Sequence, residues 1–244
     1  MKTVIILGAK SDMAKAAALQ FAKNGFDLFL VGRDATSELN EFGHSITEEF
    51  GHEVCLHDLD ILDKDATGSF LSGFKIIPDG IVSFVGLLGD QKKAIKEPTH
   101  AETILTSNFN AVVPIIDFFA NQFENRKSGF IIGVSSVAGR RGKKRNYYYG
   151  AAKAGFTAYL SGLRNRLHNK NIYIMTVLPG YVETKMTKAM DLPKWLTVSP
   201  EYVGRKIFNA YQNKKDVIYV PGIWKIIMDT ISFIPERIFK KLDI

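Results

Sequence analysis

Short runs of branched and aromatic apolar residues recur along the chain, and each run is bounded by glycine, proline or a polar residue. Runs of this length and composition predict β-strands. Seven strands are expected, over residues 3–7, 27–31, 53–57, 80–85, 129–134, 172–178 and 216–220.

The segments between these runs carry apolar residues at helical spacing. They predict helices over residues 13–24, 36–50, 64–74, 100–126, 147–169 and 200–213. Several strands are apolar on both faces, which is typical of a parallel sheet covered by helices on each side. The sequence therefore predicts an α/β fold: a single-domain, doubly wound parallel sheet of the Rossmann type. Residues 1–220 would form this domain, and residues 221–244 a C-terminal amphipathic appendage of it.

Apolar residues also recur at helical spacing in that appendage, and basic residues flank them: Trp224, Ile227, Met228 and Ile231, then Ile238, Phe239 and Leu242 among Arg237, Lys240 and Lys241. Such a face can lie on an anionic membrane, cover a substrate cleft or join two subunits. We rank packing against protein first, because apolar stripes more often serve cores than bilayers.

Composition narrows the class of protein. Hydrophobic residues make up 46% of the 244 residues and charged residues 23%, so the chain can bury a core and is not disordered. No uninterrupted apolar run reaches the ~18 residues that span a bilayer, and the N-terminus lacks a secretory pattern, so we expect a cytoplasmic protein.

Charge and cysteine content exclude little more. The net charge of +7 comes from 32 basic and 25 acidic residues, an imbalance too common to indicate a nucleic-acid partner, and none is expected. The single cysteine, Cys55, forms no intrachain disulfide and has no companions at metal-ligand spacing. We expect Cys55 in the core and no metal site.

The first predicted strand leads into Gly8 and then into an alanine-rich helix, where the pyrophosphate of a dinucleotide meets helix N-terminal N–H groups. The candidate cofactor contacts here are Gly8, Lys10, Ser11, Asp12 and Met13. Asp12 and Ala14 occupy positions where glycines are usual. An ordinary strand-to-helix turn, with Asp12 as the N-cap, is the alternative.

The second strand is followed by Arg33 rather than by an acidic residue. An arginine suits the 2′-phosphate of NADP(H), with Lys10 as a second cation, so NADP(H) is favoured and NAD(H) stays open. A solvated surface arginine is the alternative. After the third strand, Asp58 could meet an adenine amino group or cap the chain from Leu59 onward.

A tyrosine and a lysine four residues later share one helix face, and the ammonium can then lower the pKa of the phenol. Four such pairs occur, at Tyr149, Tyr181, Tyr202 and Tyr211, so the pair alone has little specificity. Only Tyr149, which pairs with Lys153, has a serine thirteen residues earlier, Ser136, at the end of a predicted strand. Tyr149 is therefore the candidate proton donor.

The chain at this point resembles the short-chain dehydrogenase/reductase family. The resemblance rests on residues 135–139 (SSVAG), residues 149–155 (YGAAKAG), Asn108 in TSNF, and residues 179–184 (PGYVET). Residues 83–86 (SFVG) stand where the family usually has Asn-Asn-Ala-Gly.

The resemblance implies a role for each site residue. Tyr149 would protonate the carbonyl oxygen while a nicotinamide delivers hydride, and Ser136 would hydrogen-bond that oxygen. Lys153 would hold the ribose hydroxyls and lower the pKa of Tyr149, and Asn108 would orient a water that links Lys153 to solvent. Further cofactor contacts would be Gly86, Pro179, Gly180, Val182 and Thr184. Ser135 is expected in the core, and Tyr147 and Tyr148 at a wall or interface.

Five cations in the six residues 140–145 lie beside the expected active site. They could clamp a phosphate or form a solvated surface. Together with the loops at 11–14 and 85–91, this run is similar to the branch that includes decaprenylphosphoryl-ribose keto reductases, which reduce a keto sugar on a lipid phosphate. The leading hypothesis is an NADP(H)-dependent oxidoreductase acting on an anionic, small or lipid-linked carbonyl substrate.

Two other functions stay open: a 3-ketoacyl carrier-protein-type reductase, and a non-catalytic NADP-sensing binding protein. The family resemblance also implies a homodimer or homotetramer formed through the catalytic helix. That helix offers small residues for close approach: Ala151, Ala154, Ala158, Ser161 and Gly162. Alternatively, these residues pack on their own sheet. Peripheral contact with the inner face of a membrane is a further expectation from the tail.

Overall fold

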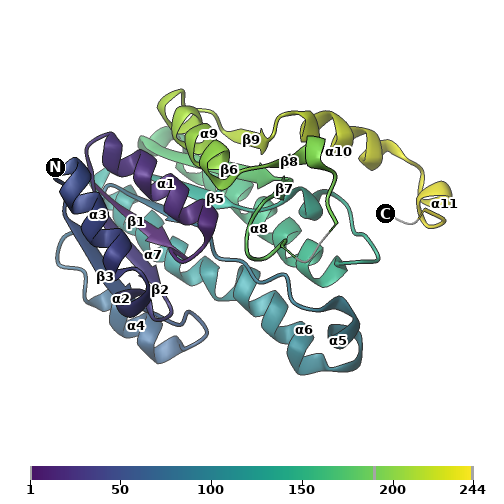
Figure 1. The fold of residues 1–244 in the computed structure, drawn as a ribbon, viewed down its shortest axis with the longest axis horizontal. Helices are drawn as coiled ribbons and strands as arrows, with labels where there is room; N and C mark the ends of the chain where they lie inside the picture. Colours follow the sequence, from purple (N-terminus) through teal and green to yellow (C-terminus); the bar gives the residue numbers. More distant parts are fainter. Residues whose placement is uncertain (1, 189–190, 243–244) are drawn as a thin grey trace.

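A sheet of seven parallel strands forms the centre of the computed structural model, which describes residues 2–188 and 191–242 (Figure 1). The strand order is β3-β2-β1-β4-β5-β6-β9. The strands are β1 Lys2–Leu7, β2 Phe26–Gly32, β3 Val54–Asp58, β4 Gly80–Ser83, β5 Gly129–Val134, β6 Ile172–Pro179 and β9 Val217–Val220. The predicted doubly wound parallel sheet is confirmed, and its order reverses between β1 and β4.

Helices cover both faces of the sheet because successive strand residues point to opposite sides. Val4 and Ile6 of β1 pack under helices α1 (Asp12–Lys23), α3 (Asn40–Phe50) and α9 (Pro200–Gln212). Ile5 and Leu7 face α4 (Lys64–Ser72), α7 (Val112–Arg126) and α8 (Tyr147–Leu167). The sheet is therefore buried on both sides, and its ligand-binding edge is the row of carboxyl strand ends.

One long helical segment, Pro98–Arg126, consists of α6 (Pro98–Leu105), a π-helical turn η1 (Thr106–Asn110) and α7. By length and composition alone it could cross a membrane. The expectation of no such segment rested on uninterrupted apolar runs, which this helix lacks. Ile115, Phe119 and Phe123 of α7 are fully buried in the core, so the segment is a core helix of the domain.

Element boundaries follow the predictions with three differences. The predicted helix 36–50 divides into α2 (Ala35–Glu38) and α3, because Leu39 between them leaves helical geometry and is buried. The short helix α5 (Gln91–Lys96) was not predicted. Two two-residue strands, β7 (Tyr181–Val182) and β8 (Thr197–Val198), form a second small sheet that is too short to leave a sequence pattern.

Cys55 is exposed, so its predicted place in the core is wrong. It belongs to β3, which lies at the edge of the sheet and is covered less than the central strands. Edge strands can therefore carry an apolar-looking sequence that remains partly open to solvent.

The C-terminal segment continues from β9 into α10 (Ile223–Phe233) and α11 (Glu236–Phe239). Trp224 and Met228 of α10 are buried against Val137, Leu178 and Leu196. This confirms the expected packing of this stripe against protein. Helix α11 lies beyond the body of the domain, at the opposite end from α4 (Figure 1). The remaining one-turn 3₁₀ helices are η2 Val137–Arg140, η3 His168–Lys170 and η4 Lys194–Leu196.

Candidate functional site

A buried lysine lies at the carboxyl ends of the central strands. Lys153, on the first half of α8, is 1% exposed. Its Nζ donates hydrogen bonds to the carbonyl oxygens of Val85 at 2.8 Å and Val134 at 3.2 Å. An ammonium has three donors, so one remains for a ligand. Burial lowers the pKa of Lys153 to about 7.

One helical turn earlier, the half-buried Tyr149 is hydrogen-bonded through its side chain to Ser136. Burial raises the pKa of Tyr149 to about 12, and the hydrogen bond with Ser136 opposes this rise only in part. The prediction that Lys153 lowers the pKa of Tyr149 is therefore wrong for this structure. The reason is geometric: the ammonium is directed at two carbonyls and lies 5.8 Å from the centroid of the Tyr149 ring.

The two adjacent serines after β5 point in different directions. Ser136 caps η2, where its Oγ accepts a hydrogen bond from the Ala138 N–H at 3.1 Å, and it also meets the Tyr149 phenol. Ser135 is 3% exposed, and its Oγ donates to the Lys153 carbonyl at 2.8 Å. Ser135 thus lies in the core, as expected, and ties β5 to the catalytic-pair helix, while Ser136 alone reaches the phenol.

Asn108 lies in the π-helical turn and is 1% exposed. Its amide donates to the carbonyls of Ile104 at 2.8 Å and Leu87 at 2.7 Å, and its Oδ1 accepts from the Leu87 N–H at 3.1 Å. The side chain therefore fixes the loop that also carries the Val85 carbonyl. Orientation of a water by Asn108 stays a prediction, for which Oδ1 retains one lone pair.

The turn after β1 has the features of a phosphate cradle. Gly8 has φ +79°, and a Cβ there would lie 3.0 Å from the Val85 nitrogen, so only glycine fits. Ser11 is the N-cap of α1, but its side chain makes no capping hydrogen bond. The first N–H groups of α1 are thus left without a side-chain acceptor, and they fit the pyrophosphate of a dinucleotide.

Asp12 has a role that the sequence did not reveal. It is the first residue of α1 rather than its N-cap, and its Oδ2 accepts a hydrogen bond from the Lys185 N–H at 3.0 Å. The alternative interpretation of Asp12 as the cap is therefore wrong, and its carboxylate joins the cradle to the loop after β7. Met13 is half-buried and packs on the core beneath α1.

The two cations expected at the ribose phosphate differ in their surroundings. Lys10 is paired with carboxylates, at 2.6 Å from Glu38 and 3.7 Å from Asp34, so it is not the free second cation that was predicted. Arg33 is exposed and has no hydrogen bond or ion pair with any residue of 2–188 or 191–242. Arg33 is therefore the cation that stays available to an anionic ligand.

Asp58 is held by the start of α2. Its two carboxylate oxygens accept from the Thr36 N–H at 2.8 Å and the Thr36 hydroxyl at 2.5 Å, and these bonds lower the pKa of Asp58. The idea that Asp58 caps the chain from Leu59 is wrong, since the Leu59 N–H donates to the Gly32 carbonyl. Leu59 is 3% exposed and packs in the core, so a cofactor contact by Leu59 stays a prediction. An adenine contact by Asp58 stays a prediction.

The predicted nicotinamide contacts lie in the turn after β6 and its continuation. Pro179 ends β6, and the Trp224 indole fills the space beside Gly180, where a Cβ would lie 1.8 Å from Nε1. Val182 is buried in β7, and the Thr184 N–H donates to the Thr187 hydroxyl at 3.1 Å.

Gly86 borders the lysine, because a Cβ built there would lie 3.5 Å from both Lys153 Nζ and Asn108 Oδ1. Three parts of the site thus lie along the carboxyl edge of the sheet: the cradle after β1, the Nζ of Lys153 and the turn after β6. That arrangement fits a dinucleotide that runs from α1 to Lys153.

The basic run between Ser136 and Tyr149 does not form the expected phosphate clamp at its first two positions. Arg140 pairs with Asp229 at 3.2 Å, and Arg141 pairs with Glu236 at 2.9 Å. Both guanidinium groups are thus occupied by the C-terminal segment. A loop that is rich in arginine and stands next to a tail with carboxylates was the only sequence signal for this contact.

Comparisons with known proteins agree with this geometry. The sequence pattern of a family described as "short chain dehydrogenase" matches residues 2–194. An uncharacterised oxidoreductase of Mycobacterium tuberculosis is 28% identical over 243 residues, covering 98% of this chain and 96% of the relative.

Two further similar proteins, one found by sequence and one by structure, have more specific names. A 3-oxoacyl-[acyl-carrier-protein] reductase of Chlamydia trachomatis is 25% identical over 78% of this chain and 77% of its own. A short-chain dehydrogenase from Sphingobium yanoikuyae, solved in complex with NADPH, superposes with a TM-score of 0.83 at 22% identity, covering 97% of each chain.

The buried lysine makes stability depend on pH. The pKa of Lys153 is about 7 in the folded protein against 10.5 for a free lysine, so the unfolded chain binds more protons between these values. The free energy of unfolding should therefore rise with pH across that window. Lys153→Met removes the titration, so we expect its stability advantage over the wild type to be largest near about pH 6 and to shrink by about pH 9. Urea unfolding of both proteins across this range measures the difference, and a pH-independent difference would contradict the assignment.

Proposed function

The chain belongs to the short-chain dehydrogenase family, whose members are NAD(P)-dependent oxidoreductases, and we propose that it reduces a ketone to a secondary alcohol with NADPH. The observation that carries the proposal is the state of Tyr149. Its pKa of about 12 keeps the phenol protonated at neutral pH, and its hydroxyl meets Ser136. A protonated phenol beside a hydroxyl is the arrangement that reduction requires, because the product oxygen must gain a proton.

In this mechanism, Ser136 donates a hydrogen bond to the substrate carbonyl oxygen and sets its position. Reduced nicotinamide, when bound, supplies the hydride. Tyr149 gives its proton to the oxygen as negative charge develops there. Lys153, held by the Val85 and Val134 carbonyls, would present its remaining donor to the ribose hydroxyls of the cofactor.

The cations that follow β1 and β2, Lys10 and Arg33, determine how well the protein can distinguish NADPH from NADH, and Arg33 favours NADPH. Arg33 is exposed and free of carboxylate partners within the described chain, so its planar guanidinium can bind a 2′-phosphate. The solved relative with NADPH supports the same choice. Lys10 would contribute only if its pairs with Glu38 and Asp34 broke.

Two substrate classes are proposed. The first is a keto sugar on a phosphate or polyprenyl phosphate, in line with the loops that resemble that branch. The second is a 3-ketoacyl group on a carrier protein, which the chlamydial relative favours. Because Arg140 and Arg141 are occupied, an anionic substrate would need cations other than these two. A purely NADP-sensing role is not favoured, since Tyr149 and Ser136 are in contact and Lys153 lies on the same helix face.

Replacing the proton donor should abolish turnover. Tyr149→Phe should lower the rate of NADPH oxidation by about 10²- to 10⁴-fold while NADPH affinity is retained, because only the transferable proton is lost. Acetoacetyl-coenzyme A and a keto-sugar phosphate are suitable substrates. Tyr202→Phe is the matched control, since Tyr202 also precedes a lysine by four residues but lies on α9. A folded Tyr149→Phe protein with near-normal rates would rule out the mechanism.

Removing the guanidinium should erase the cofactor preference. Arg33→Ala should lose about 1.5 to 3 kcal/mol of NADPH binding, or about one to two decades in affinity. Affinity for NADH should not change, and this supplies the internal control. Calorimetric titration with both dinucleotides measures the effect. Equal wild-type affinities for the two, or an unaltered preference in the variant, would refute the role of Arg33.

We also propose that the protein is a homodimer or homotetramer assembled through α8. Ala151, Ala158, Ser161 and Gly162 are exposed, so these four do not pack on their own sheet, and their small size permits two helices to approach closely. Ala158→Arg should yield a monomer from a dimer, or a dimer from a tetramer, in light scattering at low micromolar concentration. Gly68→Arg, on the exposed side of α4, is the control and should leave the assembly intact. A monomeric wild type would end this proposal.

A further inference from the structure

Helix α10 carries two apolar stripes, and only one of them is covered. Trp224 and Met228 are buried against the domain. On the other side, Ile223, Ile226 and Phe233 share one helix face by their spacing and are 43%, 65% and 85% exposed. Isolated exposed apolar residues are ordinary, but a large aromatic and two isoleucines aligned on one helix indicate a contact surface.

The chain after α10 surrounds this stripe with positive charge. Arg237, Lys240 and Lys241 are exposed, and none of them has an ion pair within the described residues. Two carboxylates within the described part of the same segment already have cationic partners, since Asp229 pairs with Arg140 and Glu236 pairs with Arg141. Ile238, between the free cations, is 54% exposed. The surface is therefore apolar and cationic.

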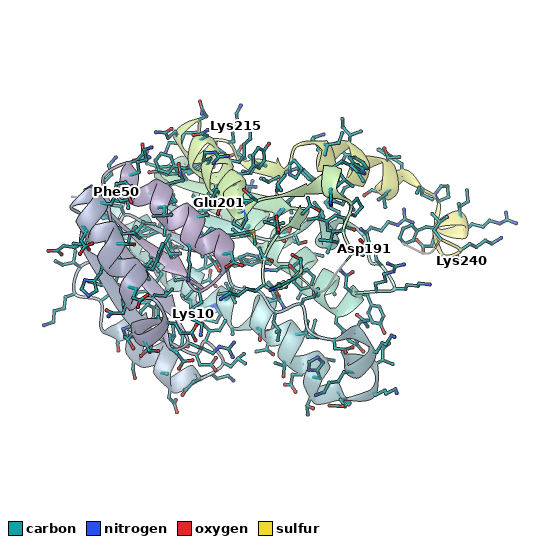
Figure 2. All side chains as sticks on the ribbon, viewed as in Figure 1. Lys10, Phe50, Asp191, Glu201, Lys215 and Lys240 are labelled. Atoms are coloured by element: carbon teal, nitrogen blue, oxygen red, sulfur yellow. The ribbon has the colours of Figure 1, made fainter. Side chains whose placement is uncertain are left out.

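Arg141 holds this surface in a fixed position on the domain. Its Nη1 donates to the carbonyl of Ile231 in the last turn of α10 at 2.5 Å and to that of Ile234, the residue that follows the helix, at 2.6 Å. The guanidinium also lies 3.7 Å from the centroid of the Phe239 ring and pairs with Glu236. The tail is thus pinned with Lys240 near its tip, away from the sheet (Figure 2).

We propose that α10 and α11 form a foot that docks peripherally on an anionic lipid bilayer. Phe233, Ile226 and Ile238 would enter the headgroup boundary, and the free cations would lie against lipid phosphates. A second copy of the chain is the poorer occupant, because the same surface of the other subunit would carry the same unpaired cations and the two would repel each other.

The foot packs directly against the chain segment that carries Ser136 of the candidate site. Val137 follows Ser136 directly and packs against Trp224 of α10. Docking would therefore hold the segment that carries Ser136 near the lipid surface, where a carbonyl compound with a long apolar chain resides. This surface stands on its own residues and does not depend on the proposed reaction.

Flotation of the full-length protein with vesicles tests the foot. Vesicles of phosphatidylcholine with about 30 mol% phosphatidylglycerol should bind the wild type, and pure phosphatidylcholine should not. Lys240→Gln with Lys241→Gln should lower the partition coefficient about thirty-fold, at about one kilocalorie per mole for each cation. Phe233→Ser should lower it about ten-fold. All three residues are exposed, so the fold should survive, and circular dichroism verifies this.

The matched control is Lys75→Gln with Ile76→Ser, an exposed basic and an exposed apolar residue on the connection that follows α4. This variant should bind vesicles as the wild type does. The proposal fails if the wild type does not float with anionic vesicles, or if the control loses as much binding as the foot variants. It also fails if Phe233→Ser abolishes self-association or binding to an acidic soluble protein while leaving vesicle binding unchanged.

Discussion

The ammonium of Lys153, with 1% of its surface exposed, must find its hydrogen-bond acceptors inside the protein. It finds them in two main-chain carbonyls, Val85 after β4 and Val134 at the end of β5. Parallel strands bring these carbonyls to one edge, and the helix carrying Lys153 must pack where its side chain can reach both. Ser135 and Asn108 then secure the two sides of this arrangement, one by bonding the Lys153 carbonyl and the other by fixing the Leu87 loop.

Burial shifts the pKa values of Tyr149 and Lys153 in opposite directions, and both shifts favour the uncharged form of the side chain. It raises the pKa of Tyr149 and lowers that of Lys153, so both groups are displaced toward their neutral forms. The site thereby limits the charge it holds in a low-dielectric region. In the proposed reduction, the phenol would keep its proton until the carbonyl oxygen needs it, and Ser136 would contact the same oxygen.

The sequence predicted the parts of the fold that follow from local pattern. The strands were found because their residues are apolar on both faces, and Tyr149 was separated from three similar tyrosines by its distance to Ser136. Contacts between exposed charged residues could not be predicted. Lys10 meets Glu38 across 28 positions, and Asp12 meets Lys185 across 173. The sequence offers many oppositely charged or polar partners for Lys10 and for Asp12, and only the folded structure shows which partner each one contacts. The direction of the pKa shift of Tyr149 could not be predicted either. The sequence shows that Tyr149 and Lys153 share a helix face, but it does not show which groups the lysine ammonium points toward.

Arg141 stands between Ser136 and Tyr149 in sequence, yet its guanidinium closes the end of α10 and pairs with the first residue of α11. The loop that carries Arg141 and the C-terminal segment that it contacts therefore depend on each other's sequence. A chimera that takes the tail from a relative without the matching loop would lose the guanidinium hydrogen bonds at the end of α10 and would leave Glu236 without its Arg141 partner. Recombination between members of this family, natural or in the laboratory, should succeed only when its crossover point keeps both segments from the same parent.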